Sequence, residues 1–202
     1  MRKVSIILLV WMMIFPAFSG CIGKEKEDLT AEDIAAKIRG EFWFAWKGYE
    51  KYAWGHDELR PLTRTYRDWY EEPLAITIID SLDSLYLLDF KSEFENAVNW
   101  VINNISFDKD IDVQVFETNI RLLGGLISAY QISGEEELLI LSIDLANRLL
   151  PAFDSPTGMP YRFVNLKTGK VSGNTSNPAE IGTLSLEFGT LSKLTKNPLV
   201  IG

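Results

Sequence analysis

The segment from Val115 to Tyr130 places charged residues in an otherwise apolar helical pattern. Glu117 and Arg121 lie four residues apart, so a helix would set both side chains on one face, which Gly124 and Ser128 continue. On a solvated helix such a pair is worth only about 0.3 kcal/mol, and most such pairs are plain surface pairs. The two adjacent glycines, however, each cost a helix roughly 1 kcal/mol relative to alanine, which favours a buried helix with another element packed against it. In such a place Glu117 would line a cavity and could act as a general acid.

Two other predicted helices also carry carboxylates. Residues 76–88 are typical of a mainly apolar helix that contains Asp83. Because an unpaired buried charge costs several kcal/mol, this aspartate needs a partner or a wet cavity. In the helix predicted over residues 178–194, Glu180 and Glu187 lie seven positions apart, which is two turns along one face.

Asp57 and Glu58 follow the first predicted helix and lie next to aromatic residues, which suits either an exposed turn or a sugar-binding rim. His56 is the only histidine in the chain. The sequence therefore excludes a histidine metal cluster and a Ser-His-Asp triad. The formal charge of −8 at pH 7 also argues against nucleic acid as a partner.

The chain of 202 residues is 47% hydrophobic, which is enough for one globular core. Apolar periodicity predicts an all-α fold of successive antiparallel helix pairs. Residues 60–72 are polar and are expected to be irregular, whereas residues 155–176 suggest a loop with a small hairpin. The predicted helices cover residues 30–52, 76–88, 93–104, 115–132, 135–150 and 178–194.

The N-terminus has the pattern of a targeting signal, with Arg2 and Lys3 before an apolar run that is too short to span a membrane comfortably. Small residues then precede Cys21, the only cysteine, as in a prokaryotic lipoprotein cleavage box. We expect residues 1–20 to be a lipoprotein signal peptide, Cys21 to be lipidated, and residues 21–29 to be a charged tether. The chain would then be anchored on the extracytoplasmic side of the cell membrane. The alternative is an ordinary leader followed by a free thiol.

Several motifs together resemble one known family. The sequence D-S-L-D-S-L begins at Asp80, and F-E-T-N-I-R-L-L-G-G begins at Phe116. Further matches, in the same order as in the family, begin at Phe42, Arg148 and Ala179. From about residue 42 to residue 198 the chain resembles glycoside hydrolase family 47, the class I α-1,2-mannosidases. It departs from the family pattern at Ser84, where the family has threonine, although the hydroxyl is kept.

The resemblance implies the N-terminal part of an (α/α)7 barrel over residues 30–202, truncated relative to the family. It also implies inverting hydrolysis of terminal α-1,2-linked mannose in an oligosaccharide, with a calcium ion deep in the barrel. Glu117 matches the catalytic acid, whereas the base and the calcium ligand lie outside this chain, which offers no metal ligand of its own. The implied substrate-binding residues are Asp83, Arg121, Glu180, Glu187, Asp57 and Glu58.

Two other interpretations remain open at this point. A membrane-anchored glycan-binding or vestigial protein would keep the pocket wall but lack a base. A purely structural helical lipoprotein fits the composition but leaves Asp83, Glu117, Arg121 and Glu187 without an explanation.

Overall fold

The structure is a computed structural model that describes residues 29–197. The predicted signal peptide, Cys21 and most of the tether therefore lie outside the described residues. The chain divides into two compact units, residues 1–40 and 41–202. Helix α2 (Ala31–Tyr52) begins in the first unit and ends in the second. At its start the Asp33 amide donates to the Thr30 hydroxyl at 3.1 Å and the Thr30 amide donates to the Asp33 carboxylate at 3.0 Å. These reciprocal hydrogen bonds cap the helix.

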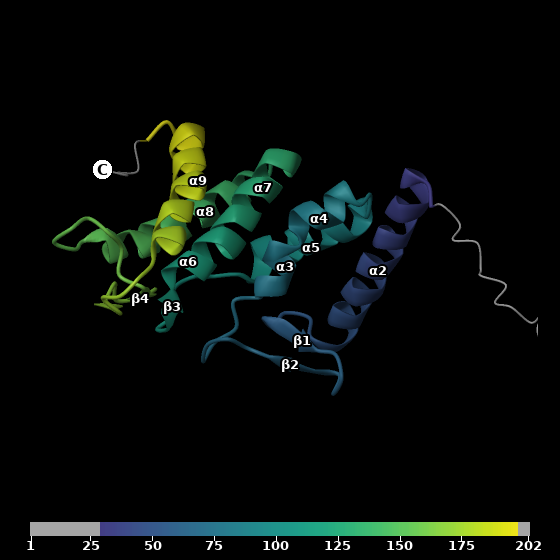
Figure 1. Cartoon of the computed structure of the whole chain (residues 1–202), viewed down its shortest axis with the longest axis horizontal. Coiled ribbons are helices and arrows are strands. Elements are labelled where there is room, and N and C mark those ends of the chain that lie inside the picture. Colours follow the sequence, from purple (N-terminus) through teal and green to yellow (C-terminus); the bar gives the residue numbers. More distant parts are fainter. Residues whose placement is uncertain (1–28, 198–202) are drawn as a thin grey trace, which may run out of the picture. The chain divides into compact units, whose positions relative to one another are not determined.

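The second unit is mostly helical, as predicted (Figure 1). One segment differs, because the single helix predicted over residues 76–88 is two short helices. The break is at Ser81, whose φ of −99° and ψ of −4° depart from helical values. The helices of this unit after α2 are α3 (Ile76–Asp80), α4 (Leu82–Leu87), α5 (Lys91–Asn104), α6 (Val115–Thr118), α7 (Gly124–Ser133), α8 (Glu136–Leu149) and α9 (Pro178–Thr195).

A π-helical segment, Asn119–Leu123, joins α6 to α7, so the long helix predicted from Val115 is continuous but not uniform. Helix α7 ends at Gly134, whose φ of 77° is in the left-handed region that glycine adopts easily. After α8 the chain continues as a 3₁₀ turn, Leu150–Phe153, with Pro151 in its first turn. A proline is tolerated in the first turn of such a segment because the amide groups there have no acceptor within the turn, so no hydrogen bond is lost.

Short strands make the described chain less purely α-helical than predicted. Strands β1 (Glu58–Arg60) and β2 (Thr65–Arg67) pair as an antiparallel hairpin within a segment that was expected to be irregular. The hairpin expected in residues 155–176 is confirmed as β4 (Phe163–Asn165) and β5 (Val171–Ser172). Strand β3 (Asp112–Gln114), which lies far away in the sequence, pairs with β4. Strands of two or three residues carry too little alternation to be predicted from periodicity.

The core of the second unit lies where the helices pack against α7. Gly125 makes this packing close, because a Cβ at this position would collide with the carbonyl oxygen of Ile79 in α3. The expectation that another element packs against the glycine pair is therefore confirmed. Among the described helices, none is both long enough and apolar enough to cross a membrane. Fully buried side chains of this core include Ile79, Leu82, Leu85, Leu122, Leu123, Leu126, Leu138 and Phe188.

Candidate active site

Arg121 is the centre of a polar cluster at the start of the central helix. Its Nε donates to Glu117 Oε2 at 2.7 Å, and its Nη1 donates to Asp80 Oδ2 at 2.8 Å. Its guanidinium carbon lies 5.5 Å from the centre of the Trp69 ring, which is within the range of a cation–π contact. The Glu117–Arg121 pair is therefore more than an isolated surface pair, because the guanidinium joins carboxylates of two helices above an aromatic ring.

The two carboxylates also determine the charge state of Arg121. Partial burial lowers the pKa of this guanidinium, but the hydrogen bonds and charges of Glu117 and Asp80 outweigh burial and raise the pKa overall. Both carboxylates thus favour the charged form of Arg121. A permanently charged, planar donor suits the orientation of a carboxylate or of sugar hydroxyls.

The π-helical segment brings a third carboxylate, that of Glu187, to this helix. Asn119 is fully buried, and its Nδ2 donates to Glu187 Oε2 of α9 at 2.7 Å. Gly124 lies beside the same carboxylate, since a Cβ there would be 3.6 Å from Glu187 Cγ. Within residues 29–197 the buried Asn119 Oδ1 has no hydrogen-bond partner. Single π turns within α-helices occur frequently at functional sites.

Asp83 of α4 faces the same helix one turn further on. Its carboxylate accepts a hydrogen bond from the Ser128 hydroxyl at 3.3 Å and another from the Ser84 hydroxyl at 3.2 Å. The face predicted from Glu117, Arg121, Gly124 and Ser128 therefore contacts carboxylates from α3, α4 and α9. Asp83 has the polar partners that its apolar sequence context required.

Asp57 was expected in an exposed turn or at a sugar-binding rim, and the structure buries it. It is only 1% exposed, and its carboxylate accepts hydrogen bonds from the amides of Leu74, Trp69 and Ile76 at 2.7, 2.9 and 3.3 Å. The reason is that the loop between β2 and α3 turns back over this side chain and directs its amide groups at it. Asp57 thus fixes the loop that carries Trp69, and its oxygens are already occupied.

Glu58 fixes the same tryptophan from the other side. Its Oε2 accepts a hydrogen bond from Trp69 Nε1 at 2.8 Å, and its Oε1 lies 2.7 Å from Arg67 Nε. Glu58 is partly exposed, so it remains at the edge of the cluster. Glu58 is connected to Arg121 through Trp69, whose ring contacts both side chains.

Glu180 lies apart from the Arg121 cluster. It is in the first turn of α9, where its amide donates to Asn177 Oδ1 at 3.0 Å, and its carboxylate lies 3.5 Å from Arg162 Nη2. The seven-residue spacing does place Glu180 and Glu187 on one helix, but they contact different partners. The structure brings Glu187 to the central helix and leaves Glu180 beside the loop that precedes β4.

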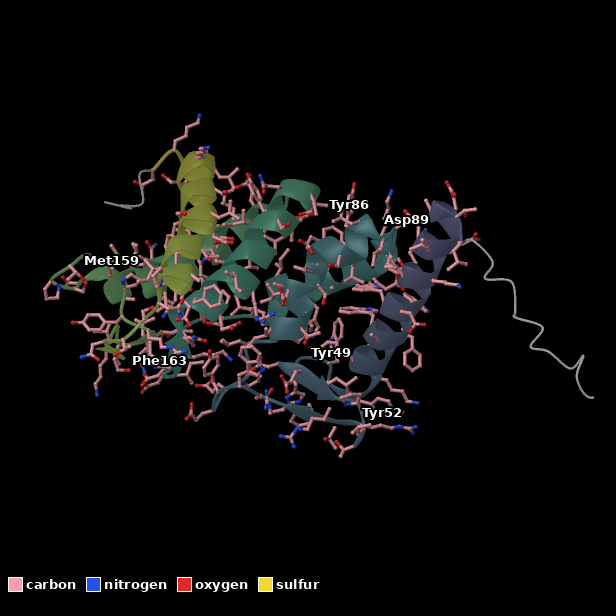
Figure 2. The ribbon with its side chains drawn as sticks, viewed as in Figure 1. Tyr49, Tyr52, Tyr86, Asp89, Met159 and Phe163 are labelled. Atoms are coloured by element: carbon pink, nitrogen blue, oxygen red, sulfur yellow. The ribbon has the colours of Figure 1, made fainter. Side chains whose placement is uncertain are left out.

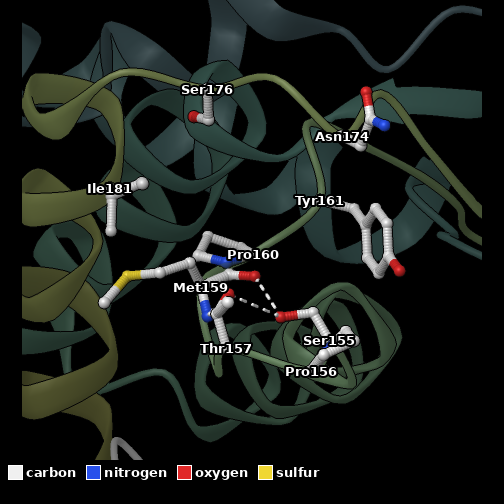
Figure 3. A pocket seen from close by; sticks show the side chains of 9 residues that line it. All are labelled: Ser155, Pro156, Thr157, Met159, Pro160, Tyr161, Asn174, Ser176 and Ile181. Carbon is white, nitrogen blue, oxygen red and sulfur yellow. Dashed lines mark hydrogen bonds between the residues drawn. The ribbon is translucent and has the colours of Figure 1, made fainter.

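A hollow of about 450 Å³ adjoins Glu180 (Figure 3). Figure 3 shows Tyr161 and Asn174 on one side of it and Met159 and Ile181 on the other. A smaller crevice next to it is lined by Tyr161, Glu180 and Phe116, the neighbour of Glu117. The side chains that line the hollow are uncharged, namely Ser155, Pro156, Thr157, Met159, Pro160, Tyr161, Asn174, Ser176 and Ile181.

The sequence did not indicate roles for Trp69, Asp80 and Asn119. Asp80 had a usable signal, because it shares helical spacing with Asp83 in the same motif. Trp69 had none, since its segment is neither periodic nor apolar. Asn119 could have been recognised only from a π-helical turn, which has no sequence signature of its own.

No group of three or more histidine, cysteine, aspartate or glutamate side chains in the described part of the chain could hold a metal ion. The carboxylates of the Arg121 cluster are directed at nitrogen and hydroxyl donors instead. These residues therefore do not fit the all-oxygen cage that calcium requires.

Comparison with known proteins gives consistent matches. The sequence profile of glycosyl hydrolase family 47 matches residues 41–199. The chain is 46% identical over 174 residues to an endoplasmic reticulum mannosyl-oligosaccharide 1,2-alpha-mannosidase of Rattus norvegicus, covering 84% of this chain and 26% of that protein. It is 43% identical over 178 residues to a mannosyl-oligosaccharide 1,2-alpha-mannosidase of Arabidopsis thaliana, covering 85% and 32%.

A solved structure is similar as well. The alpha-1,2-mannosidase from Trichoderma reesei superimposes with a TM-score of 0.75 at 34% identity, covering 81% of this chain and 37% of that one. The chain thus spans between about a quarter and two-fifths of the length of these relatives.

Proposed function

Because the chain belongs to glycosyl hydrolase family 47, we propose that it supplies the acid side of an inverting α-1,2-mannosidase active site. The substrate would be a mannose-containing oligosaccharide with a terminal α-1,2-linked mannose. The observation that carries the proposal is the bridge from Arg121 to Glu117 and Asp80 above Trp69. The described residues would form the first part of an (α/α)7 barrel.

In an inverting glycosidase one carboxylic acid protonates the leaving oxygen while a second carboxylate, roughly 6.5 to 9.5 Å away, removes a proton from water. Glu117 would be the acid: its proton passes to the glycosidic oxygen as the bond from that oxygen to the sugar C1 breaks. Water adds to C1 from the opposite face. The base that accepts the water proton would lie in the part of the enzyme outside this chain.

Arg121 would position the Glu117 carboxyl, whose Oε2 accepts a hydrogen bond from Arg121 Nε at 2.7 Å. Asp80 gives the guanidinium a second partner at 2.8 Å, so a movement of Glu117 toward the glycosidic oxygen would not leave this partly buried charge unpaired.

Asp83 and Glu187 would accept hydrogen bonds from sugar hydroxyls, as the resemblance implies. The uncharged hollow beside Glu180 would hold further units of a neutral oligosaccharide. Its volume of about 450 Å³ lies within the usual range of ligand pockets. Calcium enters this proposal only through the family resemblance, and no catalytic step is assigned to it.

The test uses a version of the protein extended to the length of the family. Glu117→Gln keeps the shape of the side chain but has no proton to give, so turnover of α-1,2-linked mannobiose should fall by about 10²- to 10⁴-fold. Binding of the disaccharide should change little. Glu137→Gln, at an exposed position of α8, is the matched control and should leave the rate unchanged. A Glu117→Gln enzyme that turns over at the parent rate would rule out this residue as the acid.

We also propose that the protein is anchored through a lipid on Cys21 to the extracytoplasmic side of the cell membrane. The support is the sequence pattern alone, a basic and apolar leader that ends in small residues before the only cysteine. Mass spectrometry of the N-terminal peptide should show a chain that begins at Cys21 with added acyl mass. An unmodified N-terminal peptide would refute the anchor without affecting the proposed active site.

A further inference from the structure

Asn119 is a buried polar residue to which the proposed function gives no role. It begins the π-helical segment Asn119–Leu123 and is fully buried. Its side chain makes one hydrogen bond, from Nδ2 to Glu187 Oε2 at 2.7 Å. Its Oδ1 is buried as well and has no hydrogen-bond partner among residues 29–197. Because Asn119 is already enclosed, no side chain from outside these residues can reach that oxygen.

The other buried asparagine of the described chain shows what a structural role requires. Asn165 belongs to strand β4, which also carries Phe163 (Figure 2). Its Nδ2 donates to Asp110 Oδ1 at 3.0 Å and to Asp112 Oδ1 at 2.9 Å. Its Oδ1 accepts hydrogen bonds from two amides of the turn that follows, at 3.1 and 2.9 Å. Both ends of this side chain are paired, so it stabilises the turn between β4 and β5.

Asn119 is only half satisfied by comparison. A buried carbonyl oxygen without a donor loses its hydrogen bonds to water on folding and gains none in return, so it destabilises the folded chain. Leucine has nearly the same shape as asparagine and would avoid that loss. Stability therefore does not explain an asparagine at this position, whereas its single hydrogen bond to a carboxylate does.

Glu187 also determines how the Asn119 amide is oriented. Turned over, the amide would place Oδ1 instead of Nδ2 at 2.7 Å from Glu187 Oε2. Two acceptors at that distance repel each other. The donor end of the amide therefore has to face the carboxylate, and the acceptor end has to remain unpaired.

The π turn places a second residue beside the same carboxylate. The Gly124 amide donates to the carbonyl oxygen of Asn119, five residues earlier, which is the hydrogen bond that defines a π turn. A Cβ on Gly124 would lie 3.6 Å from Glu187 Cγ. Asn119 and Gly124 thus both contact Glu187, where helix α9 packs against the π-helical segment (Figure 1).

We propose that Asn119 is a positioning residue for substrate binding, which holds the Glu187 carboxylate against the central helix. The inference rests on the proposed function, in which Glu187 accepts hydrogen bonds from sugar hydroxyls. Asn119 occupies Oε2 alone, so Oε1 is left for a hydroxyl. A mobile glutamate side chain would have to be ordered each time a sugar binds, whereas Asn119 orders it beforehand. Its loss should therefore weaken binding without slowing the chemical step.

The experiment compares Asn119→Leu with the parent in the protein extended to the length of the family. It measures kcat and KM for α-1,2-linked mannobiose, the Kd for mannose by calorimetry, and the midpoint of urea unfolding. We expect KM and Kd to rise about tenfold and kcat to change by less than about twofold. The midpoint should stay near that of the parent, because the variant loses a hydrogen bond but also loses the unpaired oxygen. Asn119→Ala, which adds no atoms, replaces this variant if leucine prevents folding.

Asn165→Leu is the matched control, because it removes a buried asparagine whose two polar ends are both paired. It should lower the urea midpoint and leave KM, Kd and kcat unchanged. The two variants thus separate a loss of stability from a loss of affinity for sugar.

A double variant identifies Glu187 as the partner through which Asn119 acts. Glu187→Ala removes the carboxylate and should raise KM at least as much as Asn119→Leu does. Adding Asn119→Leu to Glu187→Ala should then raise KM no further, because no carboxylate is left to position. Effects that multiply in the double variant would show that Asn119 does not act through Glu187, and the inference would be wrong.

Two further results would overturn the inference and leave the proposed function standing. One is a parent-like KM and Kd for Asn119→Leu while Glu187→Ala binds weakly. The other is a fall in kcat, or a rise in KM that occurs only together with a lower urea midpoint, because either would indicate a general disturbance of the site. An unchanged KM for Glu187→Ala would remove the role given to Glu187 and the inference with it. Parent-like turnover by Glu117→Gln would instead refute the proposed acid.

Discussion

Gly125→Ala should destabilise the protein, although alanine is the better helix former. A Cβ at this position would meet the carbonyl oxygen of Ile79, and it would lie 2.9 Å from the carbonyl carbon and 3.0 Å from Cγ2 of the same residue. Two of these atoms belong to the backbone of α3, so they cannot move away by a change of rotamer. Helix α3 or α7 must therefore shift.

The size of the effect follows from two opposing contributions. Alanine gains roughly 1 kcal/mol over glycine within a helix. Overpacking typically costs about 1 to 3 kcal/mol, and a clash with backbone belongs at the upper end, so the free energy of unfolding should fall by about 2 kcal/mol. Gly182→Ala in α9 is the matched control, because apart from its neighbours in the chain and the backbone of its own helix nothing lies within 4 Å of the added Cβ. This control should gain up to about 1 kcal/mol.

Urea unfolding followed by circular dichroism measures both variants against the parent. The midpoint should fall for Gly125→Ala and rise slightly for Gly182→Ala, with the dependence on urea unchanged. If Gly125→Ala is as stable as the parent, α3 and α7 do not pack as closely as the structure has them. The same conclusion would follow if the midpoint of both variants rose.

Three further variants or conditions give testable predictions. Asp57→Ala should lower the free energy of unfolding by roughly 4 kcal/mol, because it leaves three backbone amides without their acceptor. Asp57→Asn should lower it by about half as much. Equal effects of the two variants would contradict the role of Asp57 as the acceptor for these amides. Burial raises the pKa of Tyr49 and of Tyr70 above the usual value of 10.0, so their neutral forms contribute stability below pH 10 that is lost as the pH rises further. Tyr49→Phe should therefore flatten the alkaline fall in the unfolding midpoint. An unchanged slope would show that Tyr49 does not contribute to this fall. Arg121→Lys in the extended enzyme should slow turnover by roughly 10²-fold with little change in thermal unfolding, because lysine has no planar guanidinium that can donate to two carboxylates at once. An unchanged rate would exclude a catalytic role for the bridge between Glu117 and Asp80.

The sequence by itself determined the local structure and the family. The helical period placed Glu117, Arg121 and Ser128 on one face, and the glycine pair indicated a close neighbour for that face before any packing was known. Both inferences depend only on residues within a few turns of each other, where backbone geometry fixes which side chains are adjacent. The motifs around Asp80 and Phe116 likewise identified the family without any knowledge of contacts.

The tertiary structure decided which partners those residues have. Asp80 and Arg121 are 41 positions apart, and Asn119 and Glu187 are 68 apart. Contacts over such separations depend on how the helices pack, which no local pattern specifies. Asp57 illustrates the same limit. The two neighbouring acids suited either an exposed turn or a sugar-binding rim, but the loop before α3 buries Asp57 under its backbone amides. Whether a carboxylate is available to bind substrate or instead stabilises a loop depends on which hydrogen-bond donors the folded chain places next to it.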